Sequence, residues 1–158
     1  MGENILIFRS AKHYIVENLI ADLKRKGNPT IYLVVQDESK ARYQKMKGVN
    51  LIIYPDGYFN YQNLLCYDEV KNNLLEIPCQ KIYVPYSTTK PKVEEVEKII
   101  ANLLGRKVIY LYDKFGNIKK HQINMLIYNL LRVREKIKKY FVDFCLHFIG
   151  IWYMKGLK

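Results

Sequence analysis

The sequence lacks the cysteine pattern of a metal site or a disulfide framework. Its three cysteines, Cys66, Cys79 and Cys145, are odd in number, and none stands in a Cys-x-x-Cys pair. Structural zinc sites and disulfide scaffolds need closely spaced or paired cysteines. We therefore predict reduced thiols and no bound metal.

Leader and catalytic motifs are lacking as well. Met1 to Phe8 does not combine a basic start with a long apolar stretch, so we expect a cytoplasmic protein. The Gly-rich loops that hold nucleotide phosphates, the Gly-x-Ser-x-Gly elbow and the His-Glu-x-x-His helix do not occur. The cofactor is therefore unknown, and enzymatic activity stays undecided. If an acid or base acts, Asp56 and His13 are the first candidates.

The chain does contain an alternation of short apolar runs and helical patterns. With 158 residues, of which 49% are hydrophobic, it is long enough for one domain with a full core. Runs that are apolar at nearly every position indicate strands covered on both faces. Five such runs are present: Ile5–Phe8, Ile31–Val35, Leu51–Tyr54, Ile82–Val84 and Val108–Leu111.

Helices are predicted between these runs. Apolar residues at helical spacing extend from Ile15 to Leu23 before Gly27, and from Val93 to Leu104 before Gly105. Glu38 to Met46 and Gln62 to Leu75 predict two further helices. Because parallel neighbours need right-handed crossovers, the prediction is an α/β, three-layer, doubly wound parallel five-stranded sheet over residues 1–118. Its strand order is either Rossmann-like, 3-2-1-4-5, or flavodoxin-like, 2-1-3-4-5.

Residues 119–158 are predicted to form a basic, apolar C-terminal helical segment. Nine of the 26 Lys and Arg residues lie between Asn117 and Lys158, against two acidic residues, so this stretch carries +7 of the formal charge of +11. Tyr140 to Met154 is almost wholly apolar, but a helix of about 15 residues rises only about 22 Å and does not span a bilayer core of about 30 Å. We expect it to pack on the sheet, on a second copy in a homodimer, on a partner chain, or peripherally on an anionic inner membrane face.

Ligands of open parallel sheets bind beyond the carboxyl ends of the strands. The loop after the first strand combines basic and hydroxyl groups with a helix start, which favours an anion, although Ser10 alone can serve as a helix cap. The loops after the third and fourth strands offer groups that suit a sugar or nucleotide, and that also occur in ordinary turns. The candidate ligand-binding residues are Arg9, Ser10, Lys12, His13, Asp56, Tyr58, Asn60, Tyr86, Ser87 and Thr88.

Taken together, the opening strand and helix from Ile5 to Leu23, the polar loops Gly57–Tyr61 and Tyr86–Lys90, and the basic tail resemble one Rossmann-like half of the two-domain glycosyltransferases of the B type. In that family the donor-nucleotide site lies in the second half, which this sequence does not contain. The resemblance therefore implies a split glycosyltransferase that needs a partner chain.

Three functional hypotheses follow. The first is a Rossmann-like binding domain for an anionic or sugar-containing ligand at the carboxyl rim of the sheet, which associates through its C-terminal helix. The second is half of a split glycosyltransferase. The third is nucleic-acid binding through the basic stretch Arg132–Lys139, in which few aromatic residues alternate with the charges.

Overall fold

The computed structural model describes residues 2–55, 57–88, 93–128, 133, 134, 137 and 140. The chain divides into two compact units, Met1–Ile123 and Asn124–Lys158. In the second unit, residues 125–128, 133, 134, 137 and 140 are helical. The predicted segment Tyr140 to Met154 lies, apart from Tyr140, outside the described residues, so its packing stays a prediction.

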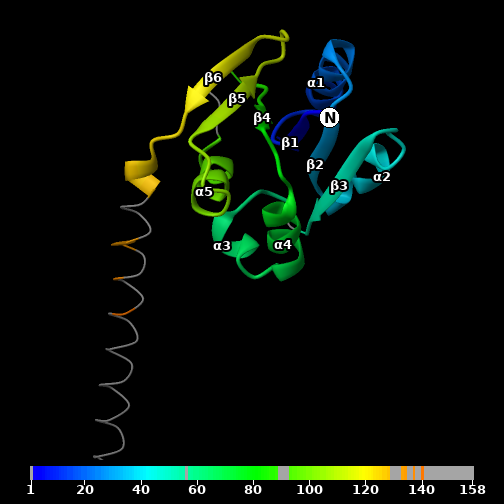
Figure 1. The fold of residues 1–158 in the computed structure, drawn as a ribbon. Coiled ribbons are helices and arrows are strands. Elements are labelled where there is room, and N and C mark those ends of the chain that lie inside the picture. The colour runs from blue at the N-terminus through cyan, green and yellow to red at the C-terminus, as the bar shows by residue number, and fades with distance from the viewer. Residues whose placement is uncertain are drawn as a thin grey trace, which may run out of the picture. The chain divides into compact units, whose positions relative to one another are not determined.

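The first unit is built on a six-stranded, mostly parallel sheet with the order β3-β2-β1-β4-β5-β6 (Figure 1). The first five strands are parallel, and their order is the Rossmann-like alternative rather than the flavodoxin-like one. The strands are β1 (Asn4–Phe8), β2 (Thr30–Gln36), β3 (Val49–Tyr54), β4 (Lys81–Pro85), β5 (Val108–Tyr112) and β6 (Ile118–Gln122).

Helices connect these strands and give the α/β architecture its outer layers. They are α1 (His13–Lys26), the short 3-10 turn η1 (Asp37–Ser39), α2 (Lys40–Tyr43), α3 (Tyr61–Leu64), α4 (Asp68–Glu76) and α5 (Glu94–Asn102). The two helices with the cleanest predicted apolar stripes are confirmed as α1 and α5. Gly105, which was expected to stop α5, has a φ of 62°, a value that glycine adopts without strain.

Successive residues of β1 pack into two separate apolar layers, one on each face of the sheet. Ile5 and Ile7 join a buried cluster that includes Leu19 of α1 and Tyr43 of α2. On the opposite face, the Phe8 ring lies edge-on against the Phe59 ring, with 5.5 Å between centroids. This alternation is what a strand covered on both faces requires, and it explains why β1 is apolar at every position from Ile5 to Phe8.

β6 corrects the sequence-based prediction, which gave five strands and a helical segment over residues 119–158. Ile118–Gln122 instead pairs antiparallel with β5, from Tyr112 opposite Ile118 to Val108 opposite Gln122. Its side chains are almost all exposed. An edge strand with one neighbour needs no apolar run, and lysines on it discourage further pairing, so the apolar-run criterion missed it.

Two of the predicted helices are also broken differently. The helix expected from Gln62 to Leu75 is divided into α3, which Asn60 caps at its start, and α4, because a turn at Leu65 and Cys66 separates the two. The helix expected from Glu38 to Met46 is a 3-10 turn followed by the single turn of α2.

None of the helices in the described part of the chain has the length and apolar character that a membrane span requires.

The packing of α1 against the sheet predicts how much stability a substitution in its buried face removes. Leu19 is fully buried between α1 and the sheet, so we expect Leu19→Ala to lower the free energy of unfolding by about 2–5 kcal/mol in urea denaturation. Asn18→Ala, on the exposed side of the same helix, is the matched control and should change it by less than about 0.5 kcal/mol. Equal effects of the two substitutions would contradict the position of α1 in the core.

Candidate binding pocket at the carboxyl edge of the sheet

The order of the parallel strands creates a crevice beside β1. From β1 the chain moves outward through β2 and β3, and then returns to the other side of β1 to form β4 and β5. Connections leaving β1 and β4 therefore diverge, and ligands of such sheets bind where they part. A pocket of about 810 Å³ lies at the ends of β1, β2 and β3 and at the start of α5. Its lining residues are Arg9, Ser10, Ala11, Gln36, Glu38, Gly57, Tyr58, Phe59, Glu94, Glu95 and Val96.

Arg9 is held at the pocket wall by groups from the end of β2. Its Nε donates to Gln36 Oε1 at 2.6 Å, and its Nη2 lies 3.3 Å from Glu38 Oε1. Gln36 Nε2 donates in return to the Arg9 carbonyl at 3.5 Å. The Gln36 side chain is buried, whereas that of Glu38 is 66% exposed. The Arg9 guanidinium is therefore fixed in direction, and part of its charge is compensated before any ligand arrives.

Ser10 joins the loop after β1 to the end of β4. Its hydroxyl donates to the Pro85 carbonyl at 2.6 Å and also lies 3.3 Å from the Phe8 carbonyl. The residue at the N-cap of α1 is Lys12, with no side-chain cap hydrogen bond, so Ser10 does not cap the helix. Its hydroxyl therefore links the ends of β1 and β4 on the two sides of the crevice.

Aromatic residues from the loop after β3 form a second wall. Phe59 is buried, with its ring 5.2 Å from that of Tyr54, whereas Tyr58 is 89% exposed. The Tyr54 hydroxyl donates to the Asn60 carbonyl at 3.0 Å and accepts from the Asn60 amide at 3.1 Å. Asn60 Oδ1 in turn accepts from the amides of Gln62 and Asn63 at the start of α3. The loop is thus anchored on both sides of Phe59.

The third wall is acidic and comes from the first turn of α5. Glu95 Oε2 accepts from the Tyr61 amide at 3.2 Å, and its other oxygen pairs with Lys98. Glu94 is exposed. With Glu38, the described lining holds three carboxylates against one guanidinium. A neutral or cationic ligand suits this charge balance better than a phosphate.

His13 belongs to a separate cluster between α1 and α2. Its Nδ1 lies 3.1 Å from the Tyr43 hydroxyl, and burial, together with the nearby Arg9 and Arg42 guanidinium groups, lowers its pKa from 6.5. Burial likewise raises the pKa of Tyr43 to about 12. His13 is therefore neutral at physiological pH, and it does not belong to the described lining of the pocket.

The remaining predicted site residues are dispersed. Lys12 is exposed and, like Asn60, is not part of the described lining. The Tyr86 amide donates to the Tyr112 carbonyl at 2.9 Å, and neither Tyr86 nor its neighbours Ser87 and Thr88 belong to that lining. Asp56 lies outside the described residues, so its suggested acid or base role with His13 stays a prediction.

Of the predicted ligand-binding residues, Arg9, Ser10 and Tyr58 thus meet at the pocket. Sequence reasoning missed Gln36, Glu38, Phe59, Glu94 and Glu95. Gln36 is the last residue of β2 and Glu38 follows it by two residues, which is the positional signal that points to this edge. Glu94 and Glu95 gave only the signal of a helix start, because nothing in the sequence reports that α5 begins beside the loop after β3.

The described residues contain no group of three His, Cys, Asp or Glu side chains that would hold a metal ion. Cys66 is exposed and Cys79 is buried, and both are free thiols. No protein-family model, curated protein or solved structure matches the chain. The residues and geometry of the pocket therefore carry the functional argument by themselves.

The hydrogen bonds of Arg9 predict that substitution of Arg9 and substitution of Glu38 lower the stability of the protein by different amounts. Arg9→Met leaves the buried Gln36 Oε1 without its donor, so we expect the free energy of unfolding to fall by about 1–3 kcal/mol in urea denaturation. Glu38→Gln removes only the exposed ion pair and should cost less than about 1 kcal/mol. A larger loss for Glu38→Gln would show that the ion pair, and not the buried amide, holds Arg9.

The lowered pKa of His13 predicts a pH dependence of stability. Between the folded pKa and 6.5, the unfolded chain binds a proton at His13 and the folded chain does not, so stability falls as the pH falls through this window. His13→Gln should therefore lose less stability than the unsubstituted protein between about pH 7 and about pH 5 in urea denaturation.

Tyr43→Phe is the control for this pH dependence. Burial is the largest cause of the lowered pKa of His13, and this substitution removes the hydroxyl while keeping the ring, so the pH dependence should persist. Parallel pH profiles for His13→Gln and the unsubstituted protein would refute the assignment to His13.

Proposed function

We propose that this protein binds a polyhydroxylated ligand, a sugar or the sugar of a nucleoside, in the pocket beside β1. The observation that carries the proposal is the combination of carboxylates from Glu38, Glu94 and Glu95 with the aromatic residues Tyr58 and Phe59 around one cavity of about 810 Å³. Sugar hydroxyls donate hydrogen bonds to carboxylates, and the apolar faces of sugars and bases pack on aromatic rings.

The position of Glu38 supports the same ligand class. In dinucleotide-binding sheets, an acidic residue that follows the second strand accepts a hydrogen bond from a ribose hydroxyl. Glu38 follows β2 by two residues, and its Oε1 pairs with Arg9, which leaves its other oxygen for a ligand hydroxyl. The phosphate part of dinucleotide recognition has no counterpart, because the loop after β1 contains no glycine.

The charge balance favours the sugar-containing alternative over the anionic one. The guanidinium of Arg9 is the one cation of the described lining, and it is already engaged by Gln36 and Glu38. Lys12 and His13, which were expected to complete an anion site, are not part of the described lining. Glycosyl transfer with a partner chain and nucleic-acid binding through Arg132–Lys139 stay predictions from the sequence.

Thermal unfolding with defined probes tests the proposal. We expect glucose, N-acetylglucosamine, adenosine or uridine to raise the Tm, because a ligand that binds only the folded state stabilises it by about 2.7 kcal/mol at a concentration 100 times its Kd. Inorganic phosphate should leave the Tm unchanged. A rise with phosphate and none with the four neutral probes would overturn the proposal.

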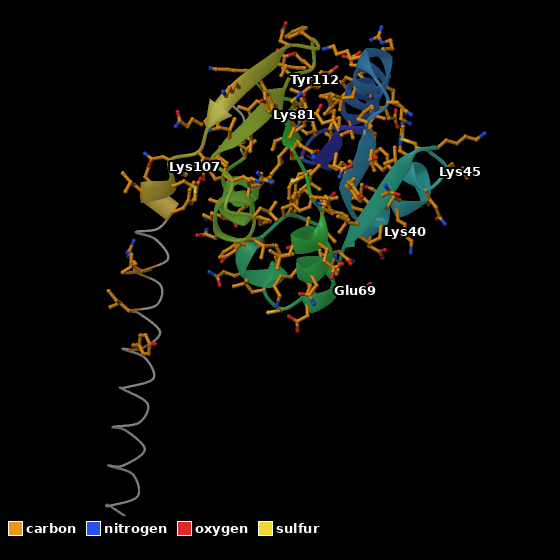
Figure 2. The ribbon with its side chains drawn as sticks, viewed as in Figure 1. Lys40, Lys45, Glu69, Lys81, Lys107 and Tyr112 are labelled. Atoms are coloured by element: carbon orange, nitrogen blue, oxygen red, sulfur yellow. The ribbon has the colours of Figure 1, made fainter. Side chains whose placement is uncertain are left out.

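A substitution then places the ligand in this pocket. We expect Glu38→Ala to weaken binding of the stabilising probe about tenfold in titration calorimetry, because a hydrogen bond to a charged acceptor is lost. Glu69→Ala is the matched control: Glu69 is an exposed carboxylate on α4 (Figure 2) and does not belong to the described pocket lining, so its substitution should leave the affinity unchanged. Equal affinities for all three proteins would exclude this pocket.

A further inference from the structure

A second surface lies where the β5–β6 hairpin meets the last turns of α1. The Tyr112 hydroxyl donates to Asp22 Oδ2 at 2.7 Å, and Asp22 also pairs with Arg25. Gly116 at the hairpin tip has a φ of 88°, and a Cβ at this position would lie 3.7 Å from the Tyr112 hydroxyl. The hairpin tip and the carboxyl end of α1 are therefore adjacent, and both lie at the upper edge of the view in Figure 1.

Strand register determines which hairpin side chains share this surface. Ile118 pairs with Tyr112 and Lys120 pairs with Tyr110, so both lie on the α1 side of the sheet. Lys119 lies on the opposite face. We use the name hairpin surface for the following six residues of the last turn of α1, the hairpin turn and this side of β6: Arg25, Lys26, Lys114, Phe115, Ile118 and Lys120.

The two carboxylates near the hairpin surface are engaged by internal donors. Asp22 accepts from Tyr112 and Arg25. The Asp113 carboxylate accepts from the Phe115 amide at 2.8 Å, the Asn117 amide at 2.9 Å and Asn117 Nδ2 at 2.8 Å. These hydrogen bonds hold the conformation of the β5–β6 turn, and they direct the Asp113 carboxylate toward the backbone. The hairpin surface itself holds four cations, of which Arg25 is paired with Asp22, and two apolar side chains.

The apolar side chains lie at the tip. Phe115 is 78% exposed and Ile118 is 39% exposed. The Lys114 ammonium lies 4.9 Å from the centroid of the Phe115 ring, so a cation accompanies the aromatic side chain. The rigid turn thus presents an exposed ring and an aliphatic side chain among lysines.

From this geometry we infer that the hairpin surface docks on an anionic lipid bilayer. Lys and Arg side chains gain energy near anionic head groups, while an exposed Phe and Ile gain by entering the boundary with the acyl chains. Nucleic acid is the less suitable anion, since binding of a single strand relies on several stacking aromatic residues and Phe115 is the one aromatic member of this surface. The inference does not depend on the ligand of the pocket.

Vesicle co-sedimentation of the full chain tests the inference. The probe is a vesicle of phosphatidylcholine and phosphatidylglycerol in equal parts, with pure phosphatidylcholine as the uncharged arm. The protein should bind the anionic vesicles, and binding should weaken as salt screens the charges. Lys114→Glu with Lys120→Glu should weaken it at least about 25-fold, because each basic side chain near an anionic surface contributes about fivefold and the glutamates add repulsion.

The matched control carries the same change of charge elsewhere. Lys40 and Lys45 are exposed around α2, away from Tyr112 and the hairpin (Figure 2). Their double substitution by Glu should affect vesicle binding much less than the hairpin pair. Phe115→Ser should weaken binding about tenfold, whereas Tyr58→Ser, at another exposed aromatic residue, should leave it unchanged. Far-UV circular dichroism of each variant verifies the fold.

Three results would overturn the inference. The first is equal loss for the hairpin pair and the α2 pair, which would mean that net charge alone drives binding. The second is unchanged binding of both pairs, which would place any membrane contact outside the hairpin surface. The third is unchanged vesicle binding together with loss of affinity for a single-stranded oligonucleotide in the hairpin variants, which would make the surface a nucleic-acid site.

Discussion

Burial of both faces of a parallel sheet is the constraint on which the rest of this structure depends. Parallel strands need long crossovers, and the helices of those crossovers cover the sheet on both sides. β1, at the centre, therefore has Ile5 and Ile7 in one apolar layer and Phe8 in the other. The same arrangement sends the outgoing loops of β1, β2 and β3 to one edge, where the pocket is found.

This constraint also explains how much of the fold could be predicted from the sequence. A strand covered on both faces must be apolar at nearly every position, so all five parallel strands were visible as short runs. α1 and α5 were visible because each buries one continuous stripe. β6 could not be predicted in this way. With one neighbouring strand and exposed side chains, Ile118–Gln122 needs no apolar pattern. The break between α3 and α4 is a turn at Leu65 and Cys66, which apolar periodicity does not record.

The candidate site could be predicted only in part, because loop membership and side-chain direction are different properties. Arg9 and Ser10 were nominated for following β1, and they line the pocket. Lys12 and His13 belong to the same short loop and helix start, yet His13 contacts Tyr43 of α2 instead. Which way a side chain points there depends on where α1 begins and on what packs beside it. Neither follows from the order of residues in the loop.

The position of charge follows the same logic. Lys119 and Lys120 counted toward a basic tail in the sequence, but they lie on β6, in the first unit. Asp22 and Tyr112 then join this hairpin to the last turns of α1, whose first turn follows the pocket loop. The hairpin itself leaves the carboxyl end of β5, where Tyr112 pairs with Pro85, and the Pro85 carbonyl accepts from the hydroxyl of Ser10 in the pocket lining. The ends of β4 and β5, and not only α1, therefore connect the pocket loop to the hairpin surface.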